Sequence, residues 1–282
     1  MTYSRDELLQ KMLLRAGRPL PDHLRKRCAR RVRGWIEARQ IARASAVVLS
    51  HAKSGRTWLA TMLSAYERAA GVSLDVFFSH DNYIRDWTAG GAQPWHAGKR
   101  LVLLAREPGD VLVSFYQHWQ HRMKPSKHWV NDYPAGPLTL WEFTEHPRTG
   151  LTQLIAFMNR LAAETAGRDD VLRVRYEDLR RQPQEALEAL IRFIAGNVDP
   201  AAVRAAVEFG SFENMQRIER GNADDPRASG RLKPGDVNNP QSFKVRSGRV
   251  GGYREAYTPE QVASIDARVR AELDPSFGYP IG

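Results

Sequence analysis

Residues 47–59 read VVLSHAKSGRTWL, and this segment determines how the rest of the chain can be interpreted. Its first three residues are apolar, which is typical of a short buried strand. From Thr57 to Ala69 apolar residues recur at the spacing of one helix face and predict a helix. A tight polar loop containing Lys53 and Gly55 joins the two. The segment therefore predicts a strand, a short loop and a helix in succession.

This arrangement favours binding of an anion. The first N–H groups of a helix lack helical partners, and the helix dipole favours negative charge there. Lys53 adds a full positive charge, and the hydroxyls of Ser54 and Thr57 add donors. The loop is P-loop-like, but it is not a Walker A motif because the lysine precedes the glycine. Taken alone, the segment also permits a lysine that merely flanks a helix.

The composition limits the class of protein. The chain has 282 residues, with 42 Lys and Arg against 32 Asp and Glu, a net charge of +10. This charge suits an anionic ligand, although nucleic acid or an acidic membrane would suit it equally. Cys28 is the only cysteine, so no intramolecular disulfide is possible. With neither an apolar leader nor a membrane span in the sequence, we expect a cytoplasmic protein.

Strand and helix signals alternate along the chain. Further strands are expected at residues 74–78, 101–105 and 171–176. The alternation predicts an α/β fold, with one domain over residues 1–282 and a mainly parallel central sheet flanked by helices. Residues 1–45 are expected to form basic helices, at 4–17 and 22–43. Residues 124–137 are expected to form a loop, and residues 221–242 a flexible loop that closes over a ligand.

The arginine-rich helix at residues 22–43 allows two interpretations. One is a surface for an acidic partner, and the other is a solvated helix that covers the sheet. We favour the second, because Trp35 and Ile36 are needed for packing.

Polar residues stand where the predicted strands end. Lys53, His80, Arg106 and Tyr176 each follow one of them. Ligands of such folds gather at the carboxyl ends of the strands. Arg106, with Ser114 on the following helix, predicts a second phosphate site, and we expect Asp110 to cap that helix.

These motifs resemble those of cytosolic-type sulfotransferases, which use 3′-phosphoadenosine 5′-phosphosulfate (PAPS). The 53–58 loop resembles their 5′-phosphosulfate loop, and residues 106–114 and 246–251 resemble their 3′-phosphate loops. Tyr176 matches a residue that approaches the adenine, and the 211–215 segment matches one that packs on the base. The resemblance implies cofactor contacts by Lys53, Ser54, Gly55, Arg56, Thr57, Trp58, Arg106, Ser114, Tyr176, Phe212, Met215, Arg246, Ser247 and Gly248.

The sequence departs from the family pattern at several positions. Ser247 stands where a lysine is usual, so Arg246 would supply the charge, with Arg249 as a second candidate. Arg56 replaces a small hydroxyl residue and would add a positive group near the sulfuryl. Phe78 replaces a lysine that often precedes the catalytic histidine. The family's C-terminal dimer signature is not evident.

The resemblance implies transfer of a sulfuryl group from PAPS to a hydroxyl or amine, which releases adenosine 3′,5′-bisphosphate (PAP). His80 is the candidate general base, because an imidazole with a pKa of about 6.5 suits that role. Lys53 would stabilise charge on the leaving oxygen. The competing histidines are His51, His118 and His121. No metal is expected, because the sequence has no metal-binding motif.

Two other functions remain open from the sequence. A nucleotide kinase or NTPase would need a magnesium-binding Asp at a strand end, where the 101–105 strand has Arg106 instead. A nucleic-acid-binding protein would use the 25–43 segment, but no readout motif is present, and nucleic acid is not expected.

The acceptor is expected to be a small molecule, a glycan or a lipid-like hydroxyl, and weak peripheral membrane contact stays open. Aromatic residues that could wall its cleft are Trp87, Trp95, Tyr116, Trp119, Trp129 and Tyr133.

Overall fold

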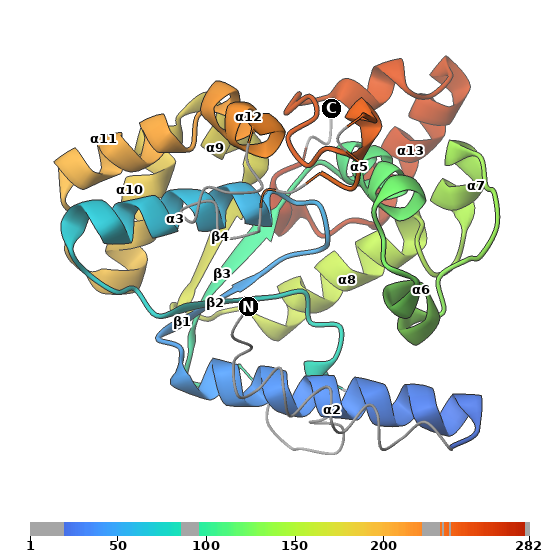
Figure 1. Cartoon of the computed structure of the whole chain (residues 1–282), viewed down its shortest axis with the longest axis horizontal. Coiled ribbons are helices and arrows are strands. Elements are labelled where there is room, and N and C mark those ends of the chain that lie inside the picture. The colour runs from blue at the N-terminus through green and yellow to red at the C-terminus, as the bar shows by residue number, and fades with distance from the viewer. Residues whose placement is uncertain (1–19, 86–95, 222–231, 233, 237, 280–282) are drawn as a thin grey trace.

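Four short parallel strands form the central sheet (Figure 1). The structure is a computed structural model that describes residues 20–85, 96–221, 232, 234–236 and 238–279. The strands are β1 (Ala46–Leu49), β2 (Val76–Ser79), β3 (Arg100–Ala105) and β4 (Val171–Arg175), in the spatial order β2-β1-β3-β4. The predicted parallel α/β fold is confirmed.

Side chains alternate between the two faces of this sheet, as strand geometry requires. Val47 and Leu49 of β1 pack into one apolar cluster, and Ala46 and Val48 into another. On the first face lie α5 (Pro108–His121), α8 (Leu151–Glu164) and α13 (Pro259–Glu272). On the second face lie α3 (Arg56–Ala70), α10 (Pro183–Ala195) and α11 (Pro200–Phe209). Both faces of the sheet are therefore covered by helices.

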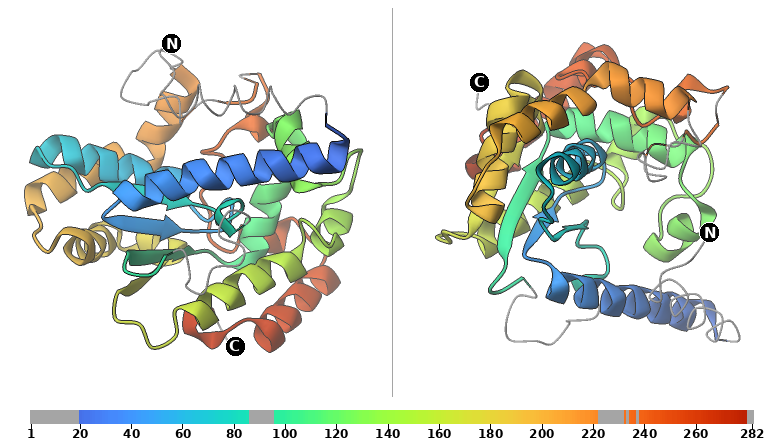
Figure 2. Two further views of the ribbon diagram at one scale, coloured as in Figure 1. Left: turned by 90° about the horizontal axis from the view of Figure 1, so that it is seen from below. Right: turned by 60° about the vertical axis from the view of Figure 1, so that its left-hand side comes forward.

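The basic helix α2 (Asp22–Arg43) lies along one side of the molecule (Figure 2). Its cations make contacts within the chain. Lys26 Nζ lies 2.6 Å from Asp132 Oδ1, Arg30 Nη2 donates to the carbonyl of Asn82 at 2.8 Å, and Arg33 donates to Tyr83 Oη at 2.9 Å. These contacts fix α6 (Pro125–Asn131) and the turn after β2. They support the interpretation of α2 as a covering helix.

Three local expectations from the sequence are wrong. The expected 124–137 loop contains α6, because Pro125 occupies the first helical position, where proline is tolerated. Glu107, and not Asp110, caps α5, since its side chain accepts from Gly109 N at 3.2 Å. Tyr176 does not end a strand but begins the short helix α9 (Tyr176–Arg181).

Two further helices are short: α7 (Leu140–Glu145) and α12 (Phe212–Gly221). The expected helix at 4–17 lies outside the described residues, as does much of the expected 221–242 loop. Within the described ranges, no helix combines the length and apolar character needed to cross a bilayer.

Candidate functional site

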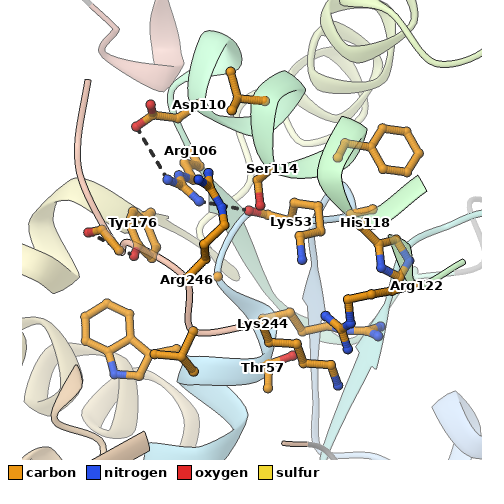
Figure 3. Close-up of a pocket in the computed structure, with 18 of the residues that line it drawn as sticks. Lys53, Thr57, Arg106, Asp110, Ser114, His118, Arg122, Tyr176, Lys244 and Arg246 are labelled. Carbon is orange, nitrogen blue, oxygen red and sulfur yellow. Dashed lines mark hydrogen bonds and ion pairs between the residues drawn. The ribbon is translucent and has the colours of Figure 1, made fainter. Parts of the chain in front are cut away.

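A cavity of about 980 Å³ lies at the carboxyl ends of the four strands. Each strand is followed by a residue that lines it: Lys53 after β1, His80 after β2, Arg106 after β3 and Tyr176 after β4. Figure 3 shows side chains from several elements converging on this space. All the residues proposed from the sequence as cofactor contacts or as the general base line the cavity except Ser54, whose side chain is buried.

The loop between β1 and α3 has an unusual backbone. Lys53 adopts φ +76° and Gly55 adopts φ +97°, both in the left-handed region. Gly55 immediately precedes α3, so the loop leads directly into the helix N-terminus. A side chain at residue 55 would collide with Tyr176, because an added Cβ would lie 2.6 Å from its Cδ2 atom. The glycine is therefore required both by its φ angle and by the close approach of the ring.

Arg106 ties this loop to a second one. Its Nη1 donates to the carbonyl of Lys53 at 3.4 Å, and its Nη2 donates to the carbonyl of Arg249 at 3.1 Å. Asp110 lies 3.5 Å from the guanidinium and also accepts from the backbone N–H groups of Gly251 and Tyr253, at 2.9 and 3.0 Å. The segment that carries Arg246, Ser247 and Gly248 is thus held beside the Lys53 loop.

Aromatic rings form a slot between these loops. The rings of Trp58 and Tyr176 meet edge to face, with centroids 5.5 Å apart. The guanidinium of Arg180 lies 5.7 Å from the Trp58 ring and 5.9 Å from the Phe212 ring. Met215 is buried below, packed against Val245. Flat apolar surfaces flanked by cations suit a planar, polar ring such as a nucleobase.

His80 is half-buried, and its Nδ1 donates to the carbonyl of Ser50 at 2.8 Å. Because a carbonyl only accepts, Nδ1 carries the proton and Nε2 has a free lone pair. Burial, reinforced by the charge of Arg56, lowers the pKa of His80 well below 6.5. The expectation of a pKa near the usual value is wrong, since it neglected desolvation by the cavity wall.

The competing histidines differ in position. His51 does not line the cavity; its Nδ1 donates to its neighbour's carbonyl at 2.9 Å, and burial lowers its pKa to about 4. His121 does not line the cavity either. His118 does, and burial followed by the charges of Lys53 and Arg122 lowers its pKa to about 3. Both His80 and His118 are therefore neutral at pH 7.

The cavity also contains charged residues that sequence reasoning missed: Glu37, Arg122, Lys127, Arg180, Lys244 and Glu255. They come from elements far apart in the chain, so no local motif identifies them. Their effect is seen at Lys53. Burial, together with Arg122 and Lys244 and then Arg106, lowers its pKa to about 7.

The aromatic wall expected from the sequence is mostly elsewhere. Tyr133 lines the cavity, but Tyr116 and Trp119 pack around Phe143. Trp129 lies against α2, where it donates to Asp22 at 2.7 Å. Trp87 and Trp95 lie outside the described residues. Across the part of the chain that the structure describes, no group of three or more His, Cys, Asp or Glu side chains is arranged to hold a metal.

Curated relatives match part of the chain. Sulfotransferase 1B1 of Canis lupus familiaris is 22% identical over 182 residues, which cover 64% of this chain and 56% of that protein. Cytosolic sulfotransferase 17 of Arabidopsis thaliana is 26% identical over 184 residues, which cover 60% and 48%. The matched region thus spans about half the length of these relatives.

Solved structures share the fold. Mouse sulfotransferase SULT7A1 complexed with PAP superposes with a TM-score of 0.54 at 16% identity, covering 82% of this chain and 84% of that one. Retinol dehydratase in complex with androsterone and PAP gives a TM-score of 0.52 at 15% identity, covering 80% of each chain. The family model for the sulfotransferase domain matches residues 92–277, about two thirds of the sequence. A match of that extent, over a fold shared with sulfotransferase structures, means that the chain belongs to the sulfotransferase domain family.

Proposed function

We propose that this chain transfers a sulfuryl group from PAPS to a hydroxyl or amine acceptor and releases PAP. The observation that carries this proposal is the single cavity shared by two anion-binding loops. Arg106 joins them, since it donates to the carbonyl of Lys53 at 3.4 Å and lines the same space. One ligand with two separated anionic groups can therefore contact both.

The residues present fit PAPS. Lys53, Thr57 and the N-terminus of α3 would hold the 5′-phosphosulfate, where a glycine at residue 55 leaves room for the backbone to approach a ligand. Arg106, Ser114 and the 246–248 segment would hold the 3′-phosphate. The slot between Trp58, Tyr176 and Phe212 would take the adenine, with Met215 beneath it.

The proposed chemistry divides between two residues. When bound, PAPS supplies an activated sulfuryl group that an acceptor oxygen can attack. The Nε2 atom of His80 takes the acceptor's proton, because Nδ1 is committed to the carbonyl of Ser50. Lys53 neutralises charge at the phosphate oxygen that is released. An anion in the cavity would raise the pKa of both groups, since it favours their charged forms.

We further propose a small-molecule acceptor and action in the cytoplasm. Two solved structures of retinol dehydratase that share this fold are complexes with androsterone and with retinol, both small molecules. Cys28 is the sole cysteine, which suits a reducing compartment. An acceptor that is specifically a glycan or a lipid-like alcohol is a more specific version of this proposal.

Calorimetric titration with PAP, ATP–Mg²⁺ and duplex DNA tests the cofactor assignment. We expect PAP to bind most tightly of the three. In thermal unfolding, PAP should also raise the melting temperature of the protein, because a ligand of the folded state stabilises it by mass action. Transfer of label from [³⁵S]PAPS to a panel of alcohols, phenols and amines then tests the reaction. Preference for ATP–Mg²⁺ would favour a kinase or NTPase, and preference for DNA would favour a nucleic-acid-binding protein; either would contradict the proposal.

A further inference from the structure

The cavity holds more positive charge than two phosphate sites require. Of the described residues that line it, nine are Lys or Arg and three are Asp or Glu. Two of the acids already have cationic partners. Asp110 pairs with Arg106 at 3.5 Å, and Glu255 pairs with Arg249 at 2.8 Å. The excess of positive charge in the cavity therefore suits a further anionic group.

The cations fall into two groups on either side of Lys53. In Figure 3 the Arg106 and Arg246 side chains lie on one side of Lys53, His118 and Arg122 lie on the other, and Lys244 lies below Lys53 toward Arg122. The electrostatic neighbours agree with this division. The charges that act on Arg246 are those of Arg106 and Asp110, whereas the charges that act on Lys244 include those of Arg122 and Lys127. We call Arg122, Lys127 and Lys244 the second cation cluster.

The second cation cluster borders His80. Lys127 of α6 lines the cavity, and its charge acts on the pKa of His80. α6 is fixed against α2, since Arg30 donates to the carbonyl of Val130 at 3.2 Å and to Asn131 Oδ1 at 3.3 Å. Tyr133, just beyond α6, also lines the cavity. The cluster therefore lies where an acceptor facing His80 would extend.

We propose that the acceptor carries a fixed anionic group, a carboxylate, phosphate or sulfate, which the second cation cluster binds while the acceptor's hydroxyl faces His80. This rests on the proposed sulfuryl transfer and narrows its substrate class. Neutral alcohols and phenols of the same shape are then poor acceptors.

The energetics of the cluster favour such a ligand. Burial and then the charge of Arg122 lower the pKa of Lys244 to about 8, and burial followed by Arg56 and Arg33 lowers the pKa of Lys127. Glu219 opposes this repulsion, but its two carboxylate oxygens also accept from the backbone N–H groups of Lys244 and Val245 at 2.8 Å. An anion on the cluster would relieve the repulsion and restore full protonation.

The test uses matched acceptors on three scaffolds: 4-hydroxyphenylacetate and its methyl ester, glucose 6-phosphate and glucose, and 12-hydroxydodecanoate and its methyl ester. Binding to the PAP-saturated protein is measured by calorimetry at low ionic strength, and transfer is measured with [³⁵S]PAPS. The variants are Lys127→Gln and Arg122→Gln, with Lys127→Arg to restore the charge. Lys124→Gln is the matched control, because it removes the same charge from an exposed position that does not line the cavity.

At least one anionic member should bind and react about tenfold or more better than its neutral partner, as expected for a charge pair near a protein surface. Lys127→Gln and Arg122→Gln should abolish most of that preference, while Lys127→Arg and Lys124→Gln should keep it. The proposal is overturned if neutral members are preferred, if no anionic member binds, or if the preference survives in both glutamine variants.

Two further results separate this inference from the proposed function. An equal loss of turnover with neutral and anionic acceptors in Lys127→Gln would mean that the cluster serves the transferred group, and it would overturn the acceptor assignment alone. Failure of PAP to bind the unmodified protein would instead contradict the proposed function. Binding of the anionic probes is then measured without PAP, so that the cluster is still tested.

Discussion

The ring of Tyr176 lies directly over Gly55, so close that a Cβ at residue 55 would fall 2.6 Å from the ring carbon Cδ2. This contact joins the end of β4 to the loop after β1. The same Tyr176 ring also contacts Arg106, whose guanidinium lies 4.4 Å from the ring centroid. One glycine thus permits the approach of three segments that line the cavity.

Gly55→Ala should weaken PAP binding and destabilise the protein. The left-handed φ angle alone costs a non-glycine residue about 1–3 kcal/mol, and displacement of Tyr176 adds to it. Gly71→Ala is the matched control, since residue 71 also has positive φ, but an added Cβ would meet nothing within 4 Å. The control should lose stability and keep PAP affinity, as measured by urea unfolding and calorimetry. Equal PAP affinity in both variants would contradict this assignment.

PAP binding should take up protons at pH 8. In the ligand-free protein the pKa of Lys53 is about 7, so the side chain is mostly neutral at pH 8, and a bound anion raises its pKa. Affinity should therefore fall as pH rises above 7, by up to about tenfold per unit from this group. Calorimetry in two buffers of different ionisation enthalpy measures the uptake. Lys53→Met should reduce it; unchanged uptake would exclude Lys53 as its source.

The same residue should affect the stability of the ligand-free protein. Its folded pKa lies below its usual value of 10.5. Between pH 7 and 10.5 the unfolded state therefore binds more protons at Lys53 than the folded state does. The contribution of Lys53 to the free energy of unfolding accordingly rises with pH. Lys53→Met should raise the melting temperature most at or below pH 7, and this gain should shrink toward pH 10. A gain in the melting temperature of Lys53→Met that grows with pH would contradict this prediction.

His80→Asn should abolish most of the turnover and leave PAP affinity unchanged. Loss of a general base typically reduces kcat by about 10²–10⁴-fold, and the asparagine amide can still donate to the carbonyl of Ser50. Because the pKa of His80 in the ligand-free protein is held well below 6.5, the acid limb of kcat/KM for PAPS, which reports the free enzyme, should also lie well below pH 6.5. An acid limb near 6.5, or near-normal turnover by the variant, would remove His80 as the base.

Asp110→Asn should loosen the 246–253 segment. The carboxylate of Asp110 accepts two backbone N–H groups and pairs with Arg106. Buried hydrogen bonds to a charged group each contribute about 1.5–3 kcal/mol, and the amide can replace only part of them. We expect a lower urea midpoint and weaker PAP binding. Asp178→Asn, which breaks an exposed pair with Arg181, is the control and should change neither.

The sequence predicts the sheet and its strand-end residues well, because both leave local signals. The apolar runs of β1 and β3 and the loop at 53–55 can be identified without knowledge of the fold. α6 could not be predicted, since Pro125 suggests a helix break as readily as a helix start. The second cation cluster has no local signal at all, because Arg122, Lys127 and Lys244 meet only when α5, α6 and the segment after α12 are brought together.

The pKa of His80 could not be predicted for a similar reason. Its depression follows from burial and from the charge of Arg56, which lies on a different element. Sequence identifies the residue type and its place after β2, but desolvation depends on the packing around the cavity. The lowered pKa of Lys53 could not be predicted for the same reason, since it also follows from burial and from charges on other elements.

The most direct test compares the binding of PAP, adenosine 5′-phosphate and adenosine 3′-phosphate to the unmodified protein, Lys53→Met and Arg246→Gln. The account predicts that PAP binds most tightly, that Arg246→Gln weakens PAP and the 3′-phosphate but not the 5′-phosphate, and that Lys53→Met does the reverse. If PAP binds no better than adenosine 5′-phosphate, or if each variant weakens all three nucleotides equally, the two loops do not hold opposite ends of one nucleotide.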